Sequence, residues 1–387
     1  MLIVFVTNKI ISVDTILPIL LEAKQCNNQR IVVVVSRKKG IQAIENNIVI
    51  NDTINKIGFK FLFGGRYRNR WYKRTIGSIQ FLLLFIAGIF RAKFIHFDIL
   101  HTVPMKILSK FFKSRVFYSE RDSIKNHNAT HYHKNKFGKK YSEGSYPLPL
   151  GGNIISYYDD RLYYYFGRKV HEKRNVYQLG PTRARDSWVN YINNSSSYYF
   201  NKFHKGVDIS NGIIFIVLTF YDIESKTFNE EDRLSQRKLR QNFENTVDVL
   251  SNIKGDIPVF LKPHSYTDLE YVNSILSEYS GFHITYLHPS MLIQNSRFVI
   301  CNYYTTILGD AHNLGVTTIE YTYYANYIRK AIGDGSQQPN FVDWFVYDDK
   351  NKFKDVVTML VDRNFERRHS VKDDNLRQRD ALLTDLC

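Results

Sequence analysis

Residues 212–219 read Gly-Ile-Ile-Phe-Ile-Val-Leu-Thr, and this apolar, largely β-branched run predicts a buried strand. Residues 230–253 then have the length and spacing of a long helix, and Ile257-Pro258-Val259-Phe260-Leu261 predicts the next strand. Strands that are apolar on both faces are typical of a parallel sheet covered by helices. The stretch 212–261 therefore predicts an α/β fold.

The same alternation extends in both directions along the chain. Toward the carboxyl end we expect strands at residues 282–286, 297–301 and 316–320, and a helix from about residue 305 to 314. Toward the amino end we expect a helix at residues 13–24 and strands at residues 2–6, 30–35, 97–101, 115–118 and 153–157. Two successive halves of this kind predict two lobes facing a cleft, with ligands bound beyond the carboxyl ends of the strands.

The length and composition agree with two domains. The chain has 387 residues, of which 44% are hydrophobic, so both halves can bury a core. We place the first domain at residues 1–190 and the second at residues 210–345. The polar stretch 191–209 is the expected linker, and residues 346–387 form an expected helical segment.

Cysteine usage and the first residues bear on the compartment. Cys26, Cys301 and Cys387 are far apart and form no CxxC pair, which excludes a disulfide framework and a cysteine-based zinc site and fits a reducing compartment. Residues 1–10 lead directly into a strand and lack the basic region and cleavage site of an export signal. We therefore expect a cytoplasmic protein.

Positive charge is concentrated between Lys60 and Arg115. The formal net charge of the chain is +16, and this stretch contains 12 Lys or Arg residues and one acid, Asp98. It encloses the apolar run 79–90, which is too short to span a bilayer. Two interpretations stay open: a buried core helix with solvated basic ends, or a helix that contacts an anionic membrane surface. We expect no nucleic-acid partner, because no nucleic-acid-binding motif surrounds the stretch.

Lys262, His264 and Ser265 follow directly after the predicted strand that ends at Leu261. A lysine ammonium and an imidazole at the carboxyl end of a strand can both donate hydrogen bonds to a phosphate. The alternative is an exposed loop with an ordinary histidine.

Thr305 and Thr306 follow the next candidate strand, at the predicted start of a helix. Free backbone N–H groups and the helix dipole attract anions at such a position, although a threonine there can also simply cap the helix. Asp310 lies one turn into this helix, and we place Glu320 after the following strand. This order favours a phosphate-binding site over two unrelated loops.

Four carboxylates are candidates for chemistry. Glu120 and Asp122 follow a strand of the first half, Asp222 follows the first strand of the second half, and Asp232 is near it. A carboxylate at such a position can act as a general base or as a nucleophile, but each of these acids could also be a solvated surface group. We expect no metal, because the chain has no Asp-x-Asp pair placed for it and the histidines at 127, 131 and 133 are loosely spaced.

The run from Asn295 to Gly315 resembles the donor-domain signature of GT-B glycosyltransferases, in which a strand leads to a Ser/Thr pair and a helix with an acid-Ala step that ends in Leu-Gly. Lys262-Pro263-His264 resembles the Lys-x-His-Pro element of bacterial transferases that use CMP-activated acid sugars. These are the capsular and O-antigen Kdo transferases and, more distantly, the sialyltransferases and polysialyltransferases. The resemblance covers about residues 210–325, and the first half only in outline.

The resemblance implies two Rossmann-like domains of the GT-B type, with the acceptor side on the first and the nucleotide-sugar donor on the second. It implies that the nucleotide and its phosphate are held by Lys262, His264, Ser265, Thr305, Thr306 and Asp310. It places Asp222 at the anomeric centre, with Asp232 as a substitute, and Glu120 or Asp122 at the acceptor proton. The CMP-sugar is then a co-substrate, and no other cofactor is expected.

The implied function is transfer of Kdo, or of another nonulosonic acid, to a glycan or lipid-linked glycan of a bacterial surface polysaccharide, either lipopolysaccharide O-antigen or capsule. The expected location is the inner face of the cytoplasmic membrane, with residues 60–115 as the contact. The sequence departs from the family pattern in three respects. Ser265 stands where the family has proline, with His288-Pro289 as a pair elsewhere; threonines replace serines at 305 and 306; and Glu120-Arg121-Asp122 matches a Glu-Asp-Gly element only in part.

Two alternatives stay open. The first is a GT-B transferase with a UDP-, GDP- or CDP-linked donor, including polyol-phosphate transfer of the teichoic type. The second is a non-catalytic module that binds a polyanion or a membrane through residues 60–115.

Overall fold

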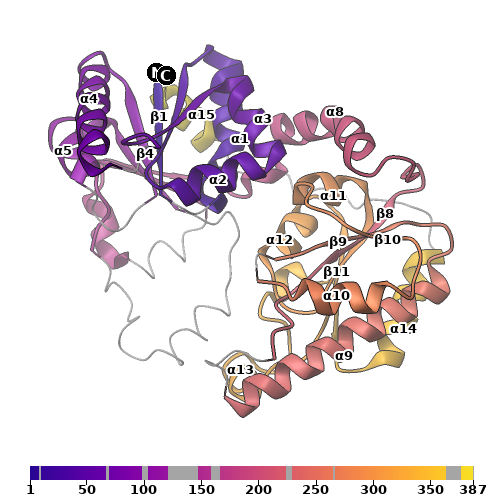
Figure 1. Cartoon of the computed structure of the whole chain (residues 1–387). Helices are drawn as coiled ribbons and strands as arrows, with labels where there is room; N and C mark the ends of the chain where they lie inside the picture. Colours follow the sequence, from indigo (N-terminus) through magenta and orange to yellow (C-terminus); the bar gives the residue numbers. More distant parts are fainter. Residues whose placement is uncertain are drawn as a thin grey trace. The chain divides into compact units, whose positions relative to one another are not determined.

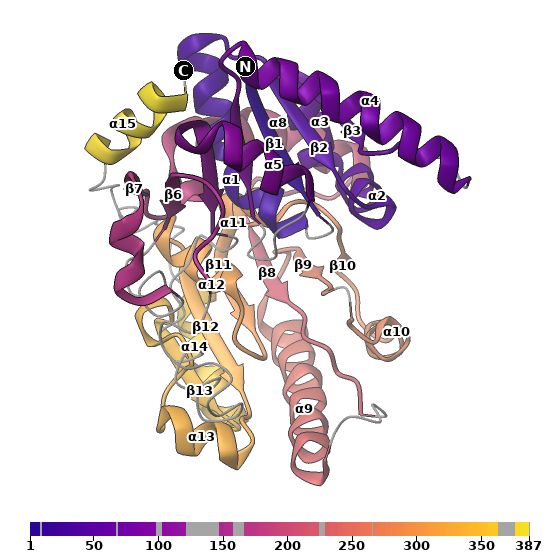
Figure 2. The same cartoon turned by 90° about the vertical axis from the view of Figure 1, so that its left-hand side faces the viewer.

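The computed structural model describes residues 1–7, 10–66, 69–97, 103–120, 147–157, 166–223, 229–264, 266–362 and 376–386. These residues divide into two compact units. The amino-terminal unit contains the described residues up to Trp188 together with residues 376–386, and the carboxy-terminal unit contains the described residues from 189 to 362. Each unit has one parallel sheet with helices packed on it (Figure 1 and Figure 2), so the α/β prediction is confirmed.

The sheet of the amino-terminal unit has seven strands in the order β3-β2-β1-β4-β5-β6-β7, all parallel. In chain order the strands are β1 (Leu2–Val6), β2 (Ile31–Val35), β3 (Gly58–Leu62), β4 (Lys93–His96), β5 (Val116–Ser119), β6 (Asn153–Ser156) and β7 (Asn175–Gln178). Chain order reverses next to β1, which is the arrangement of a doubly wound Rossmann-type sheet. The described strand in this region is β4, which ends at His96, and residues 98–101 of the strand predicted at 97–101 lie outside the described residues.

Helices cover both faces of this sheet. The helices of the unit are α1 (Ile10–Asn27), α2 (Lys38–Asn46), α3 (Ile48–Ile57), α4 (Arg70–Ile89), α5 (Val103–Phe111) and α15 (Leu376–Leu386), with short 3-10 turns at Lys113–Arg115, Gly167–Glu172 and Thr182–Ala184. Figure 1 shows α4 and α5 on one side of β1 and β4, and α1 to α3 on the other. Ile3, Phe94 and Val116 pack against Leu84 of α4 and Leu108 of α5 in one apolar cluster.

The sheet of the carboxy-terminal unit has six strands in the order β10-β9-β8-β11-β12-β13, all parallel. In chain order they are β8 (Ile213–Val217), β9 (Val259–Lys262), β10 (Phe282–Ile284), β11 (Ser296–Cys301), β12 (Thr317–Thr322) and β13 (Trp344–Tyr347). The stretch that begins at Gly212 is thus a buried central strand, as its apolar run predicts. Again the order reverses next to the first strand, here between β8 and β11.

The helices of this unit are α9 (Glu230–Ile253), α10 (Leu269–Leu276), α11 (Pro289–Asn295), α12 (Thr306–Asn313), α13 (Asn326–Ile332) and α14 (Lys350–Asp362), with a 3-10 turn at Pro339–Phe341. Leu239, Phe243 and Leu250 of α9 and Phe353 of α14 pack on one face of the sheet. Helix α11 contacts β8 and β11, and helix α12 contacts β11 and β12. The predicted helix 230–253 is confirmed with the same bounds.

The chain passes between the units differently from the predicted division. Most of the expected linker 191–209 lies in helix α8 (Asp186–Phe203), which buries Trp188, Ile192, Tyr199 and Phe200. The expected helical segment 346–387 also divides, because α14 belongs to the carboxy-terminal unit and α15 to the amino-terminal unit. Asp385 of α15 accepts hydrogen bonds from Asn175 and Tyr177 of β7, which fixes α15 beside that strand.

The apolar run 79–90 forms the second half of α4 and buries only one of its sides. Leu84 and the two glycines Gly77 and Gly88 are buried, while Leu82 and Leu83 are 58% and 60% exposed. The interpretation of this run as a buried core helix is therefore wrong for most of its length. Within the part of the chain that the structure describes, no helix reaches the length and hydropathy needed to cross a bilayer.

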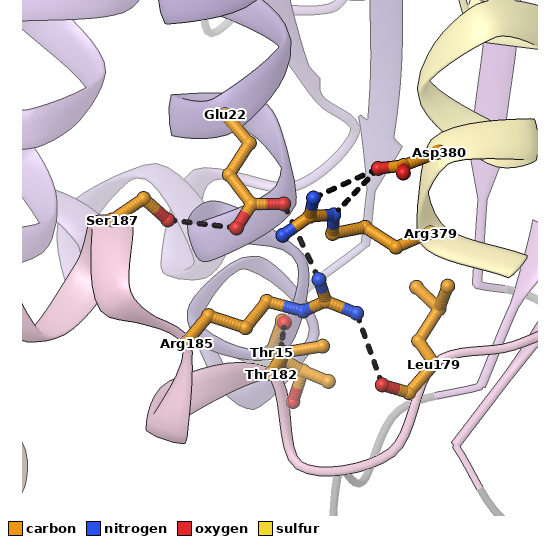
Figure 3. Close-up of polar contacts among 8 residues, drawn as sticks. All are labelled: Thr15, Glu22, Leu179, Thr182, Arg185, Ser187, Arg379 and Asp380. Carbon is orange, nitrogen blue, oxygen red and sulfur yellow. Dashed lines mark hydrogen bonds and ion pairs between the residues drawn. The ribbon is translucent and has the colours of Figure 1, made fainter. Parts of the chain in front are cut away.

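A buried polar network joins α1 to the segment before α8 (Figure 3). Arg185 pairs with Glu22 at 3.4 Å and donates to the carbonyl oxygen of Leu179 at 3.0 Å, while Ser187 donates to the other oxygen of Glu22 at 2.8 Å. The side chains of Arg185 and Glu22 are 2% and 8% exposed, so both charges are desolvated and depend on each other. This pairing fastens the chain just before α8 to α1.

Candidate functional site

The reversal of strand order in the carboxy-terminal unit lies between β8 and β11. In open α/β sheets the loops that follow two such strands part at the carboxyl edge and leave room for a ligand. Here these loops are residues 218–223 after β8 and residues 302–305 after β11. Both carry polar side chains that the sequence analysis selected, Asp222 and Thr305.

The strand register aligns four residues in one row near this edge. Val217 of β8 pairs with Lys262 of β9 on one side and with Cys301 of β11 on the other, and Cys301 pairs with Glu320 of β12. Paired residues of parallel strands share a face, and this face is opposite to the one packed against α9. Lys262 and the end of β11 are therefore about 10 Å apart across β8, from two strand spacings.

A buried hydrogen bond connects the loops on either side of the reversal. The hydroxyl of Tyr221 donates to Oδ1 of Asn302 at 2.9 Å, and Nδ2 of Asn302 donates to the carbonyl oxygen of Tyr321 at 3.1 Å. Tyr221 and Asn302 are fully buried. The two loops are thus held at a fixed separation, as a preorganised site requires.

Tyr221 has a backbone conformation that bulky residues rarely adopt, with a φ of 55°. It is held there by Arg240 of α9, which donates to the carbonyl oxygen of Tyr221 at 2.7 Å and also pairs with Asp268 at 2.8 Å. Strained residues of this kind cluster at functional sites because the surrounding structure must enforce them. The next residue is Asp222, so the backbone conformation of Tyr221 sets the direction in which the chain continues to Asp222.

His264 belongs to the loop after β9, which is fastened to the loop after β8. The hydroxyl of Thr267 donates to the carbonyl oxygen of Thr219 at 2.7 Å. The backbone N–H of Asp268 donates to the carbonyl oxygen of Phe220 at 2.9 Å. The His264 ring lies edge-on to Phe220 with centroids 5.1 Å apart. Loss of water around the ring lowers the pKa of His264, so the imidazole is neutral at pH 7.

The backbone N–H of Tyr266 donates to Nδ1 of His264 at 3.4 Å. In a neutral ring this places the proton on Nε2, which can then donate to a ligand oxygen.

Helix α12 begins at the end of the loop after β11. Thr305 is its N-cap and accepts from the backbone N–H of Ile307 at 3.4 Å, so the capping interpretation of this threonine holds. Thr306 is the first helical residue and is half-buried, and Asp310 is buried one turn later. The N–H groups of Ile307 and Leu308 both donate to Thr305, so an anion at this helix start would be held by the dipole and by the first N–H of the helix, that of Thr306.

Glu320 lies inside β12, so its expected position after the strand is wrong. It is fully buried and accepts hydrogen bonds from the hydroxyls of Tyr324 and Ser336. Burial raises the pKa of Glu320 to about 7, although the two hydroxyls counteract the rise. Sequence analysis missed this buried carboxyl because β12 continues two residues further than its apolar run.

Two buried glutamines follow Ser336, the residue that donates a hydrogen bond to Glu320. Within the described residues, the side chains of Gln337 and Gln338 are buried and their amide atoms have no hydrogen-bond partner. Their backbone N–H groups donate to Tyr324 and Ser336, which places them beside the Glu320 cluster. Nothing in the sequence pattern marks these glutamines, because two adjacent polar residues after a Gly-Ser step are typical of an exposed turn.

We expect Glu320→Gln to remove a pH-dependent loss of stability. Between about pH 4.5 and pH 7 the folded protein keeps the Glu320 proton that the unfolded chain has lost, so wild-type stability falls as the pH rises and levels off above pH 7. The cost at pH 8 is on the order of 3 kcal/mol. Urea unfolding from pH 5 to pH 8 should show that the free energy of unfolding of the variant rises relative to that of the wild type as the pH rises. If the two free energies kept a constant difference over this range, the raised pKa of Glu320 would be contradicted.

Asp232 and the His288-Pro289 pair have structural partners. Asp232 forms a capping box with Asn229 at the start of α9 and also accepts from the hydroxyl of Tyr327. His288 caps α11 by accepting from the backbone N–H of Ser290 at 3.1 Å, which accounts for the His288-Pro289 pair. Ser265 lies outside the described residues.

Glu120 lies at the carboxyl edge of the other sheet, after β5. It is buried, and its carboxylate accepts from the hydroxyl of Ser156 at 2.7 Å and from the backbone N–H of Tyr157 at 3.2 Å. This is a desolvated carboxylate held between β5 and β6, and both of these hydrogen bonds go to its Oε2. Asp122 and the histidines 127, 131 and 133 lie outside the described residues, and in the described part no group of three His, Cys, Asp or Glu residues could hold a metal ion.

Comparisons with known proteins place the fold. No protein-family model matches the chain, and no curated protein sequence matches it. Among solved structures, the chain is similar to the UDP-GlcNAc 2-epimerase of Methanocaldococcus jannaschii, with 12% identity, a TM-score of 0.58 and 99% of each chain covered. It is also similar to the UDP-GlcNAc 2-epimerase of Neisseria meningitidis bound to UDP-GlcNAc, with 9% identity, a TM-score of 0.58 and coverage of 100% of this chain and 99% of that chain.

These likenesses establish the fold and go no further at such low identity. Two Rossmann-type parallel sheets in tandem, matched over the full length of these structures, define an α/β fold of the GT-B type. The fold expected from the resemblance is confirmed. A fold of this kind supports several chemistries, so the reaction must be argued from the residues at the sheet edge.

Proposed function

We propose that the chain is a glycosyltransferase that takes a CMP-activated acid sugar, Kdo or another nonulosonic acid, and transfers it to a glycan or lipid-linked glycan of a bacterial surface polysaccharide. The observation that carries the proposal is the placement of Lys262 level with Cys301 on the two sides of β8, since Cys301 ends the strand whose loop leads to α12. Lys262 and the start of α12 can neutralise one anionic leaving group from two sides. The structural neighbours support a nucleotide-sugar ligand, because one of them is bound to UDP-GlcNAc.

In the proposed reaction the phosphate of CMP lies between Lys262, the Nε2 proton of His264 and the first turn of α12 at Thr305 and Thr306. These groups stabilise the charge that develops as the bond from the sugar to CMP breaks. For the chemical step we propose Asp222 as the carboxylate that acts at the anomeric centre, and Glu120 or Asp122 as the base that takes the proton of the acceptor hydroxyl. The choice of CMP rests on the Lys262-Pro263-His264 element.

A nucleotide panel tests the donor. We expect CMP to raise the thermal midpoint of the protein by several degrees at millimolar concentration, and CMP-Kdo to be consumed when a polysaccharide acceptor is present. Stabilisation by CDP, UDP or GDP without any by CMP would reject the CMP donor and favour the diphosphate-donor transferase. Absence of a response to every nucleotide would reject the transferase class.

A second candidate is a nucleotide-sugar epimerase, which the likeness to two UDP-GlcNAc 2-epimerases favours. It requires no acceptor. Incubation with UDP-GlcNAc alone separates the two functions. An epimerase forms a second UDP-sugar from it, whereas the proposed transferase leaves UDP-GlcNAc unchanged.

A further inference from the structure

Helix α4 presents a row of large apolar side chains to solvent. Ile79, Leu82, Leu83, Ile86 and Ile89 recur at the spacing of one helix face, and each is exposed. Phe90, at the end of the helix, is 81% exposed. An amphipathic helix of a globular protein normally turns such a face toward the core. The core of this unit already receives the opposite face through Leu84, so among the described residues of the unit the row stays uncovered.

Helix α5 extends the same apolar surface. The ring of Phe111 lies against Phe85 of α4 with centroids 5.3 Å apart, and Phe111 itself is mostly exposed. Val103, at the other end of α5, is also exposed. We call these exposed residues, from Ile79 to Phe90 on α4 with Val103 and Phe111 on α5, the α4–α5 face.

Cations and aromatic rings border this face. Arg70, Lys73 and Arg74 occupy the first turns of α4 and are exposed, as are Arg91 directly after it and Lys106 and Lys110 on α5. Trp71 and Tyr72 stand among the first group, with Trp71 71% exposed. The described residues from 60 to 115 include no acid to neutralise these charges. Rings and long cationic side chains of this kind belong where apolar and aqueous phases meet.

The apolar row and the cations of the α4–α5 face together favour one kind of binding partner over the others. A second copy of the chain would bring an equally basic surface against this one, and the like charges would repel. Nucleic acid would match the charges but would leave the apolar row without a partner, because its outer surface is phosphate and sugar. An anionic bilayer matches both, since head groups pair with the cations while the aliphatic side chains enter the acyl region.

We propose that the α4–α5 face docks on an anionic lipid bilayer, with α4 lying in the plane of the interface. At 20 residues α4 is about 30 Å long, so its basic first turns and Arg91 contact head groups on either side of the apolar row. The docking does not depend on the nucleotide. It adds to the proposed function by bringing the enzyme to lipid-linked acceptors.

Co-sedimentation of the full chain with vesicles tests the docking. We compare neutral phosphatidylcholine vesicles with vesicles that also contain 30% phosphatidylglycerol, a composition chosen for the assay, and expect binding to the anionic ones. The variant Leu82→Ser/Leu83→Ser/Ile86→Ser should lower the bound fraction at least about tenfold, because it removes apolar contacts with the acyl region. Lys73→Glu/Arg74→Glu should weaken binding more at low salt than at high salt.

The matched control is Leu234→Ser/Tyr286→Ser, which removes exposed apolar side chains from the other unit and should bind vesicles as the wild type does. Thermal midpoints and consumption of a donor with a water-soluble acceptor show that each variant is folded, and they report on the proposed reaction independently. Equal sedimentation of the wild type and the triple variant would overturn the proposal. So would a wild-type dimer in solution that the triple variant converts to a monomer, because the face would then be a contact between copies.

Discussion

His264→Ala is expected to lower kcat/KM for the nucleotide-sugar donor by about 100- to 1000-fold, the effect of removing one donor from a preorganised anion site. The neutral imidazole accepts at Nδ1 from the backbone N–H of Tyr266, which leaves the proton on Nε2. The measurement is steady-state kinetics with the donor identified by the nucleotide panel. The thermal midpoint should change little, because the ring is largely exposed.

Two variants sharpen this experiment. His264→Asn keeps an N–H donor on a shorter side chain and should recover part of the lost rate, whereas a residue that only filled space would not show this order. His171→Ala changes an exposed histidine of the amino-terminal unit and should leave the kinetics unaffected. Near-normal turnover of His264→Ala would exclude His264 from the site without affecting the fold assignment.

Arg185→Ala is expected to destabilise the amino-terminal unit by about 3–5 kcal/mol, the cost of leaving one member of a buried ion pair without its partner. Glu22 would keep Ser187 but lose its counter-charge, and the carbonyl oxygen of Leu179 would lose its donor. For a unit of this size, such a loss lowers the thermal midpoint by roughly 10 °C. Urea unfolding followed by circular dichroism measures the difference in free energy.

An exposed ion pair provides the control. Lys350 and Asp248 are 2.7 Å apart, closer than Arg185 and Glu22, but their side chains are 47% and 44% exposed. Lys350→Ala should therefore cost less than about 1 kcal/mol. The double variant Glu22→Leu/Arg185→Met should recover much of the stability lost by Arg185→Ala, because it removes both buried charges together. Equal effects of Arg185→Ala and Lys350→Ala would contradict the buried pairing.

The sequence predicted the elements whose signal is local. The apolar strands β1, β2, β8 and β11 and the long helix α9 stand out by period and length alone. Strands β3, β7 and β13 escaped notice because each is at or near the edge of its sheet and only partly buried, which weakens the apolar pattern. Helix α8 was mistaken for a linker because a run of Asn and Ser is typical of loops, and only tertiary packing overrides it.

The site could be predicted only at the level of strand ends. Lys262 and the start of α12 were selected because polar residues after strands of a parallel sheet meet at one edge; the register places Lys262 level with Cys301 at the end of β11, and the binding roles stay predictions. The roles of Tyr221, Asn302 and Glu320 depend on bonds between residues more than 15 positions apart, which no local pattern encodes. The predicted chemistry of Asp222 and Glu120 stays a prediction.

The position of α15 has a consequence for how the protein forms during synthesis. The carboxy-terminal unit leaves the ribosome before residues 376–386, so it can fold while the amino-terminal unit still lacks a helix. Until then β7 is an open strand edge, since the backbone N–H of Gln178 has yet to meet the side chain of Gln378. A nascent chain therefore exposes a pairing edge until residues 376–386 have been made and have packed on β7, and removing these residues would make that exposure permanent.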